Sequence, residues 1–233
     1  MRIIHYILLI MIFAACKNQP DLQSERLFVE EKPPIPIKVV NDEKDSIQKF
    51  VNDTSAWRDL KLIDPDFILD IRYATANNFV GEQIYECGKC LLRKEAAKAL
   101  LKVHKKFKQL GYRIKLFDCY RPHPAQQKLW DKVPNASYVT PPWKGSNHNK
   151  GLAVDLTLVD EDGDELAMGS GYDFFGKEAH HDHLDHPETV LANRLLLKNT
   201  LKEVGFSSIR TEWWHYNFYG VKYPVSDMEW ECQ

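Results

Sequence analysis

Two periodicities of apolar residues run along the chain, and each predicts one kind of element. Between residues 94 and 109 apolar side chains recur at helical spacing, as at Ala97, Leu100 and Phe107, and Gly111 follows. This pattern predicts a helix that ends before the glycine. Apolar and polar residues alternate in 66–73 and 112–117, and apolar residues fill most of 152–158. These three segments are therefore predicted to be strands.

Prolines and glycines mark the remaining boundaries. The expected elements are a short helix from Pro122 to Trp130, loops at 137–146 and 160–176, a helix over 187–204 and an extended stretch at 206–219. Pro187 suits the start of the second helix, and Gly205 suits the position just past its end. Strands and helices do not follow a regular β-α-β order, so the expected class is α+β, in a single domain.

The amino terminus has the pattern of an export signal. Arg2 precedes an apolar run at 3–13, which is followed by Ala14, Ala15 and Cys16. This resembles the lipobox of bacterial lipoproteins, in which the cysteine is lipidated; the alternative is an ordinary secretory signal. We therefore expect an exported, lipid-anchored protein on the periplasmic side of a bacterial cell envelope. The predicted organisation is a signal peptide at 1–15, a flexible, proline-containing tether at 16–45 and a folded domain at 46–233.

Composition limits the class of partner. Of the 233 residues, 44% are hydrophobic and 27% are charged, which is close to the average for globular proteins. The 31 basic and 33 acidic side chains give a formal net charge of −2. Nucleic-acid binding relies on clustered positive charge, so no nucleic-acid partner is expected. Membrane contact is expected only through the lipid on Cys16, because the apolar run before it is too short to span a bilayer.

The first chemically distinctive stretch joins a histidine and a carboxylate across a glycine. His148 precedes Gly151 in a predicted loop, and Asp155 interrupts the apolar strand at 152–158. A carboxylate within an apolar strand needs a partner, because an unpaired buried charge is unfavourable. Residues seven apart on a regular strand face opposite sides, but a turn at Gly151 could bring His148 and Asp155 to one point. Such a pair suits a divalent metal ion of the zinc type.

The second distinctive stretch places Glu212 three residues before His215. A histidine ligand with an offset carboxylate is the pair that a metallopeptidase needs, because the carboxylate can move a proton. We expect Trp213 and Trp214 to wall the site and raise the pKa of the carboxylate. The alternative is that His215 is a satisfied core histidine and both tryptophans are core residues. The two stretches together favour the metal site.

Five segments between residues 70 and 215 resemble one family, in the same order along the chain. They are 70–81, the D-x-Y-R-P motif at 118–122, the S-x-H-x-x-G-x-A-x-D motif at 146–155, 168–174 followed by His180 and His181, and E-W-W-H at 212–215. They resemble the VanX-type D-alanyl-D-alanine dipeptidases of the zinc DD-peptidase family. The resemblance implies a central, mainly antiparallel sheet flanked by helices, as in DD-peptidases and Hedgehog proteins. It also implies zinc-dependent hydrolysis of D-alanyl-D-alanine to free D-alanine, in peptidoglycan turnover or glycopeptide resistance.

The resemblance implies roles for the matching residues. His148, Asp155 and His215 would hold one zinc ion per chain, and Glu212 would act first as general base and then as general acid. Arg121 would stabilise the oxyanion formed at the scissile carbonyl; the alternative is a purely structural ion pair with Asp118.

The resemblance also implies a substrate end of the site. Asp173 would bind the free ammonium of a small D,D-dipeptide; the alternative is that Asp173 is a turn residue. Ser146 and Tyr73 are further candidates for contact with the substrate. A carboxylate at this end distinguishes a dipeptidase from a D,D- or L,D-carboxypeptidase acting on longer wall peptides, which is the first alternative function. The second alternative, a non-catalytic zinc-bearing wall-binding protein, would not need Glu212.

The cysteines and a group of histidines leave further questions open. With Cys16 assigned to lipid, four cysteines remain, at 87, 90, 119 and 232. In an oxidising compartment one bridge from the Cys87/Cys90 pair to Cys119 is favoured. Reduced thiols, or a structural metal site completed by His123, are the alternatives. The four histidines between 180 and 186 are expected to form a polar cap rather than a second metal site.

Overall fold

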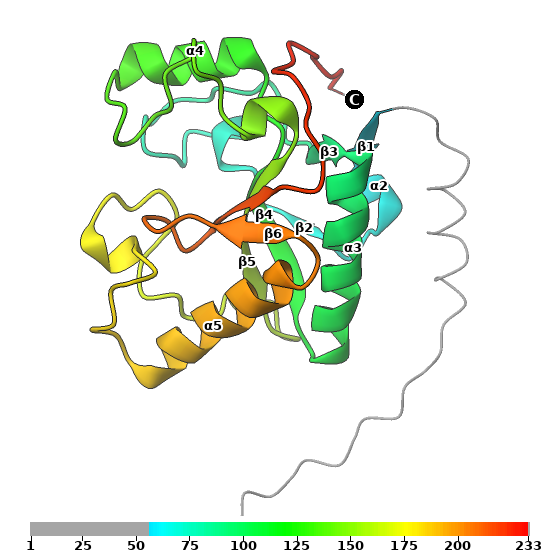
Figure 1. Ribbon diagram of the computed structural model, residues 1–233, viewed down its shortest axis with the longest axis vertical. Coiled ribbons are helices and arrows are strands. Elements are labelled where there is room, and N and C mark those ends of the chain that lie inside the picture. The colour runs from blue at the N-terminus through cyan, green and yellow to red at the C-terminus, as the bar shows by residue number, and fades with distance from the viewer. Residues whose placement is uncertain (1–55, 233) are drawn as a thin grey trace, which may run out of the picture. The chain divides into compact units, whose positions relative to one another are not determined.

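The folded domain is built around a five-stranded sheet (Figure 1). The computed structural model describes residues 56–232, so the predicted signal peptide at 1–15 and tether at 16–45 lie outside the described residues. The order of the strands is β2-β4-β5-β7-β6, and a separate two-stranded sheet pairs β1 with β3. The strands are β1 (Trp57–Asp59), β2 (Ile68–Leu69), β3 (Leu91–Arg93), β4 (Arg113–Asp118), β5 (Ala153–Val159), β6 (Phe206–Ser208) and β7 (His215–Phe218).

The sheet is mainly antiparallel, as expected for this α+β class. Only β2 and β4 pair in parallel, whereas β4–β5, β5–β7 and β6–β7 pair antiparallel. Every residue of β5 is buried, because the strand lies in the middle of the sheet and its side chains are covered on both faces. The polar side chains of β5, Asp155 and Thr157, are therefore held away from solvent.

Helices cover the sheet and frame its ends. They are α2 (Leu60–Ile63), α3 (Lys94–Gln109), α4 (His123–Lys132) and α5 (Glu188–Lys202), with short 3₁₀ turns η1 (Arg72–Ala74), η2 (His148–Lys150) and η3 (Lys177–Ala179). The bounds of α3 are those predicted from its apolar spacing, and its buried face packs against β4 and α5. Figure 1 shows α4 at the opposite end of the domain from α5. No helix in 56–232 has the length and apolar character to cross a bilayer.

Two predicted strands are interrupted, and both interruptions have a structural reason. The strand expected over 66–73 stops after Leu69, because Arg72 turns back to pair with Asp70 at 3.0 Å and the chain enters η1. The carbonyl of Tyr73 then accepts hydrogen bonds from the backbone of residues 84 and 85 instead of from the sheet. The extended stretch expected over 206–219 is an antiparallel hairpin, β6–β7, whose connecting loop carries Glu212.

Two disulfides hold the loops around the sheet. Cys90 bonds to Cys119, which is one form of the bridge expected from the sequence. A second bridge, which was not predicted, joins Cys87 to Cys232 near the end of the chain. All four cysteines of the described residues are thus in disulfides, so the alternatives of reduced thiols and of a structural metal site with His123 are wrong. The Cys90–Cys119 bridge anchors the segment that follows β4, which carries Arg121.

Candidate active site

The register of the central strands brings two of the candidate ligands together. Asp155 on β5 and His215 on β7 are directly opposite partners in the antiparallel pair. Directly opposite residues project from the same face of a sheet, so their proximity follows from the strand pairing itself. The Nδ1 atom of His215 lies 2.9 Å from Oδ1 of Asp155. Asp118 of β4 is the partner of Asp155 on its other side, next to an irregularity in the β4–β5 register.

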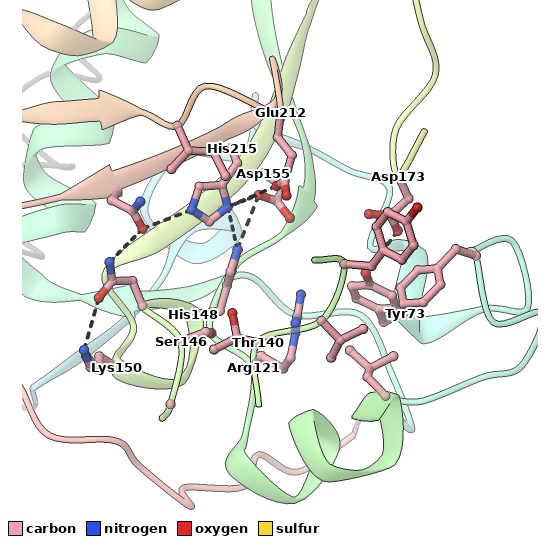
Figure 2. A pocket seen from close by; sticks show the side chains of 18 of the residues that line it. Tyr73, Arg121, Thr140, Ser146, His148, Lys150, Asp155, Asp173, Glu212 and His215 are labelled. Carbon is pink, nitrogen blue, oxygen red and sulfur yellow. Dashed lines mark hydrogen bonds and ion pairs between the residues drawn. The ribbon is translucent and has the colours of Figure 1, made fainter. Parts of the chain in front are cut away.

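His148 reaches the same point from η2. Gly151 ends this turn at φ +68°, in the left-handed region that glycine adopts readily. A Cβ atom at this position would collide with the ring of Trp57, so space as well as backbone conformation requires the glycine. The Nε2 atom of His148 lies 3.3 Å from Oδ1 of Asp155 and 3.1 Å from Nδ1 of His215 (Figure 2). The turn expected at Gly151 therefore completes the group.

Outer hydrogen bonds fix which nitrogen of each histidine points inward. The Nδ1 atom of His148 donates to the carbonyl of Cys119 at 2.6 Å, which leaves Nε2 as the inward atom. The Nε2 atom of His215 donates to Oδ1 of Asn217 at 3.0 Å, which leaves Nδ1 inward. The hydroxyl of Tyr172 donates to the outer oxygen of Asp155 at 3.1 Å. Such orienting contacts accompany the histidines and carboxylates of metal sites.

The group has the composition and electrostatics of a metal site. One ligand atom each from His148, Asp155 and His215 lies within 4.8 Å of the others, and this is the one such group in residues 56–232. Burial opposes the ionisation of Asp155, but the neighbouring histidines outweigh it and hold its pKa below the ordinary value. Burial likewise opposes the charge of His215, but Asp155 raises the pKa of His215 to about 9. The three atoms thus stabilise positive charge at their centre, as a cation-binding group must.

Glu212 lies next to the metal-binding group but is not one of its three ligand residues. Its Oε2 atom is 3.9 Å from Nδ1 of His215, and it faces the cavity from the β6–β7 loop. Burial raises the pKa of Glu212; His215 opposes this rise, and the charge of Asp155 adds to it. A carboxylate with a raised pKa, placed next to a metal-binding group, is suited to accept a proton and return it.

The expectation that the neighbouring tryptophans wall the site was wrong. Trp213 and Trp214 are both buried in the hydrophobic core and are not among the residues that line the cavity. The indole of Trp213 donates to Oγ of Ser170 at 3.0 Å, and Trp214 packs edge-on against Tyr172. The physical reason is apolar burial: both indole rings are covered by the hydrophobic core, whereas the polar Glu212 and His215 face the cavity. The pKa of Glu212 is raised by its own burial in the cavity.

Arg121 is both an ion-pair partner and a cavity residue. Its Nη2 and Nε atoms donate to one oxygen of Asp118 at 2.7 and 3.2 Å, and Nη1 donates to Gln126 at 3.0 Å. The guanidinium also lies over the ring of Tyr73, 4.9 Å from its centre. Burial opposes its charge, but Asp118 and then the nearby tyrosines raise the pKa of Arg121 well above its ordinary value. Arg121 therefore carries a fixed positive charge in a held orientation.

Asp173 lies at the other end of the cavity from the histidines (Figure 2). Its backbone is in the left-handed region, with φ 57°, and the hydroxyl of Tyr73 donates to its Oδ2 atom at 3.0 Å. Burial, followed by the negative charge of Asp155, raises the pKa of Asp173 well above the ordinary value for aspartate. A cation placed beside this carboxylate would relieve both effects.

All the residues predicted for the site line one cavity of about 390 Å³. They are Tyr73, Arg121, Ser146, His148, Asp155, Asp173, Glu212 and His215. Ser146 is held there by Asn149, whose side-chain oxygen accepts from the backbone N–H of Ser146 at 2.8 Å. The cavity is of the size that accommodates small organic ligands, roughly 300–1,000 Å³.

Several cavity residues were not predicted. Asn217 could have been found, because it follows His215 by two positions on a strand and so shares its face. The aromatic residues Phe79, Tyr138 and Phe175 also line the cavity, but they come from three separate loops and no local pattern marks them. The histidines at 180–186 take other partners: His180 contacts Arg210, and His186 bonds to the carbonyl of Glu178.

Known proteins are similar to this chain in sequence. Residues 53–231 match the Peptidase_M15 family model, described as D-Ala-D-Ala dipeptidase. A D-alanyl-D-alanine dipeptidase of Escherichia coli is 38% identical over 183 residues, which cover 78% of this chain and 95% of the relative. A D-alanyl-D-alanine dipeptidase of Enterococcus faecalis is 32% identical over 176 residues, which cover 66% of this chain and 87% of the relative.

The solved structures that match are more distant. The vancomycin-resistance D,D-pentapeptidase VanY in complex with Zn(II) gives a TM-score of 0.38 at 16% identity, covering 56% of this chain and 74% of that chain. An LD-carboxypeptidase, LdcB, gives the same TM-score at 22% identity, covering 59% of this chain and 60% of that chain.

Proposed function

The chain belongs to the D-Ala-D-Ala dipeptidase family of peptidases, and from this we propose that it hydrolyses D-alanyl-D-alanine to two molecules of D-alanine, using one zinc ion. The observation that carries the proposal is the layout of the cavity. A metal-binding group with a spare carboxylate lies at one end, and the partly buried carboxylate of Asp173, whose pKa is raised, lies at the other. A zwitterionic dipeptide fits between them with its ammonium at Asp173.

His148, Asp155 and His215 would hold the zinc. Two imidazole nitrogens and one carboxylate oxygen are a donor set that zinc favours in catalytic sites, and their outer hydrogen bonds fit the same role. Zinc in such a site polarises the scissile carbonyl and makes water a stronger acid.

Proton transfer falls to Glu212. Its carboxylate would accept the proton of the attacking water and would then deliver it to the nitrogen of the leaving D-alanine. The raised pKa of Glu212 favours the first step, because a stronger base accepts the proton of water more readily. It also keeps the acid form populated until that proton is delivered to the leaving amine.

Arg121 would stabilise the negative charge that develops on the carbonyl oxygen. Asp118 and Gln126 already hold the guanidinium in place, so little reorganisation is needed when this charge appears. The pairing with Asp118 is thus compatible with a catalytic role and supports it by fixing the orientation of Arg121.

Asp173 would make the site specific for dipeptides with a free amine. An acylated substrate would place a neutral amide against this partly buried carboxylate, whose charge would then lack the substrate ammonium as a partner. This argues for a dipeptidase over the alternative, a D,D- or L,D-carboxypeptidase acting on longer wall peptides. Ser146 and Tyr73 line the same cavity and would contact the bound dipeptide.

We further propose that the protein acts outside the cytoplasm, anchored through lipid on Cys16. The signal-like run at 3–13 and the cysteine after Ala15 support export, and the two disulfides suit an oxidising compartment. An exported enzyme would meet D,D-dipeptides released from the cell wall, so we favour a role in peptidoglycan turnover.

One assay tests this function. The domain is incubated with D-Ala-D-Ala and with N-acetyl-D-Ala-D-Ala, with and without a chelator, and the same is done for Glu212→Gln. We expect cleavage of the free dipeptide alone, loss of activity with chelator, recovery with added Zn²⁺, and a loss of about 100- to 10,000-fold in the variant.

The control is Glu203→Gln, which changes an exposed glutamate that pairs with Lys106 and is not among the residues that line the cavity, so it should leave activity intact. Equal cleavage of the acetylated dipeptide would contradict the dipeptidase assignment. Full activity in the presence of chelator, or in Glu212→Gln, would contradict the mechanism.

A further inference from the structure

Three aromatic side chains form one wall of the cavity, which we call the aromatic wall: Phe79, Tyr138 and Phe175. Tyr138 stacks on Phe175 with ring centres 4.4 Å apart, and Phe79 meets Phe175 edge-on at 5.1 Å. The three residues come from the loops after η1, after α4 and before η3. Aromatic rings that lie this close and at these angles support one another, so the wall is a single surface.

The wall begins next to the carboxylate that would bind the substrate ammonium. Phe175 follows Asp173 by two residues, and Tyr73, which donates to Asp173, meets Phe79 edge-on at 6.1 Å. In an amino acid the ammonium and the side chain are attached to the same carbon. A group that holds the ammonium therefore also fixes where the side chain of the amino-terminal residue can lie, and here that region is bordered by aromatic rings.

The wall is larger and more exposed than a methyl side chain requires. Tyr138 and Phe175 remain 45% and 39% exposed, although both line the cavity. A cluster of apolar rings open to solvent marks a surface that can take up an apolar group. The methyl group of D-alanine would cover little of this surface, whereas a branched aliphatic side chain would cover much more of it.

We propose that the aromatic wall is the subsite for the side chain of the amino-terminal residue, and that the protein therefore also hydrolyses D,D-dipeptides with a larger apolar residue at that position, such as D-Leu-D-Ala. The reaction breaks the amide C–N bond; water supplies a hydroxyl to the carbonyl carbon and a proton to the amine, giving D-leucine and D-alanine. This rests on the proposed function, because it takes Asp173 as the ammonium-binding group.

The test compares three dipeptides on the wild-type chain and its variants. D-Leu-D-Ala places the bulky group at the wall, its isomer D-Ala-D-Leu places the same group on the other residue, and D-Ala-D-Ala reports the basal reaction. We expect Phe175→Ala to lower kcat/KM for D-Leu-D-Ala by about tenfold or more, while the other two substrates change by less than about threefold.

The chain offers a matched control. Phe174 is the adjacent residue and is 45% exposed, but it is not among the residues that line the cavity. Phe174→Ala should leave all three rates unchanged. Tyr138→Ala should repeat the selective loss, and it replaces Phe175→Ala if circular dichroism shows that the latter does not fold.

The outcomes separate this proposal from the function on which it rests. Equal loss on all three dipeptides in the folded wall variants, or cleavage of D-Ala-D-Ala without D-Leu-D-Ala by the wild type, overturns the subsite. Cleavage of D-Leu-D-Ala without D-Ala-D-Ala overturns the proposed substrate but keeps the subsite. If neither dipeptide is cleaved, both proposals are wrong.

Discussion

The two ends of the cavity are built in different ways. At the metal-binding end, Asp155 and His215 are opposite each other in a regular antiparallel pair, and His148 lies one tight turn before the strand of Asp155. At the substrate end, Asp173 and the aromatic wall lie on loops whose positions depend on side-chain contacts rather than on a backbone ladder. The first end is fixed by strand register, and the second is fixed by contacts between distant segments.

This difference separates two kinds of requirement. Metal-ligand atoms must hold their distances closely, which a buried sheet provides, whereas loops on a rigid scaffold can change side chains without disturbing it. We therefore expect substitutions at the substrate end to alter which substrates are cleaved while the metal stays bound. Substitutions at the metal-binding end should instead lower the affinity for the metal and so reduce the rate of cleavage of every substrate by the same factor.

The largest effect that tests this separation is expected from Asp173→Asn. The substitution keeps the size of the side chain but removes the charge that would face the substrate ammonium. We expect kcat/KM for D-Ala-D-Ala to fall by about 100-fold or more, because one partner of a charge pair inside the cavity is lost. Bound zinc, measured by metal analysis, should be unchanged.

Asp162→Asn is the control, because Asp162 is an exposed aspartate on the adjoining loop. If Asp173→Asn also lost its zinc, the two ends of the cavity would not be independent.

A smaller effect is expected behind the metal-binding end, at Asn217. Its side-chain oxygen accepts from His215 and also from Asn147 at 2.9 Å, so it fixes the ring that presents Nδ1 to the centre. Asn217→Leu removes this acceptor at similar size. We expect zinc affinity to fall by about 10- to 100-fold, with the ratio of rates on different dipeptides unchanged once zinc is saturating.

The exposed Asn77→Leu serves as the matched control. A changed substrate preference in Asn217→Leu at saturating zinc would show that this residue acts on the substrate rather than through His215.

The same division explains what the sequence could predict. The helix 94–109 and the strand through Asp155 could be predicted, because each depends on periodicity. The metal-binding group could be predicted although His215 lies 60 positions from Asp155, because each of its two stretches carries a local motif. The break after Leu69 could not, since it depends on the carbonyl of Tyr73 bonding to residues 84 and 85. The bridge to Cys232 and the aromatic wall depend equally on contacts between distant loops.

The roles of the tryptophans show the limit of local reasoning from a motif. The spacing of Glu212 and His215 indicated a shared site, and both line the cavity. The two tryptophans between them were assigned to the same wall, but both are buried in the hydrophobic core. Proximity in sequence therefore identified the chemistry but not the lining of the cavity.

The smallest effect concerns His181, which contacts the loop that carries Glu212. The backbone N–H of His181 donates to the carbonyl of Arg210, at the start of the loop that carries Glu212. Burial, followed by the positive charges of Lys198 and Arg194, lowers the pKa of His181 to about 4. Its Nε2 atom is buried without a hydrogen-bond partner among the described residues, so the folded chain favours the neutral ring.

Because the unfolded chain would bind a proton at His181 near pH 6.5, it takes up protons before the folded chain does as the pH falls. The contribution of the neutral His181 ring to the free energy of unfolding is therefore complete above about pH 6.5 and is lost as the pH falls from about 6.5 to 4. This loss is about 2 kcal/mol after allowance for partial exposure of the ring. Burial also lowers the pKa of His104, so the wild type loses stability from both residues. His181→Phe removes only one of them. The free energy of unfolding is measured in urea for both proteins, with chelator, at pH 7.5 and pH 4.5. It should fall less between these pH values in the variant than in the wild type. An equal fall would mean that folding does not lower the pKa of His181.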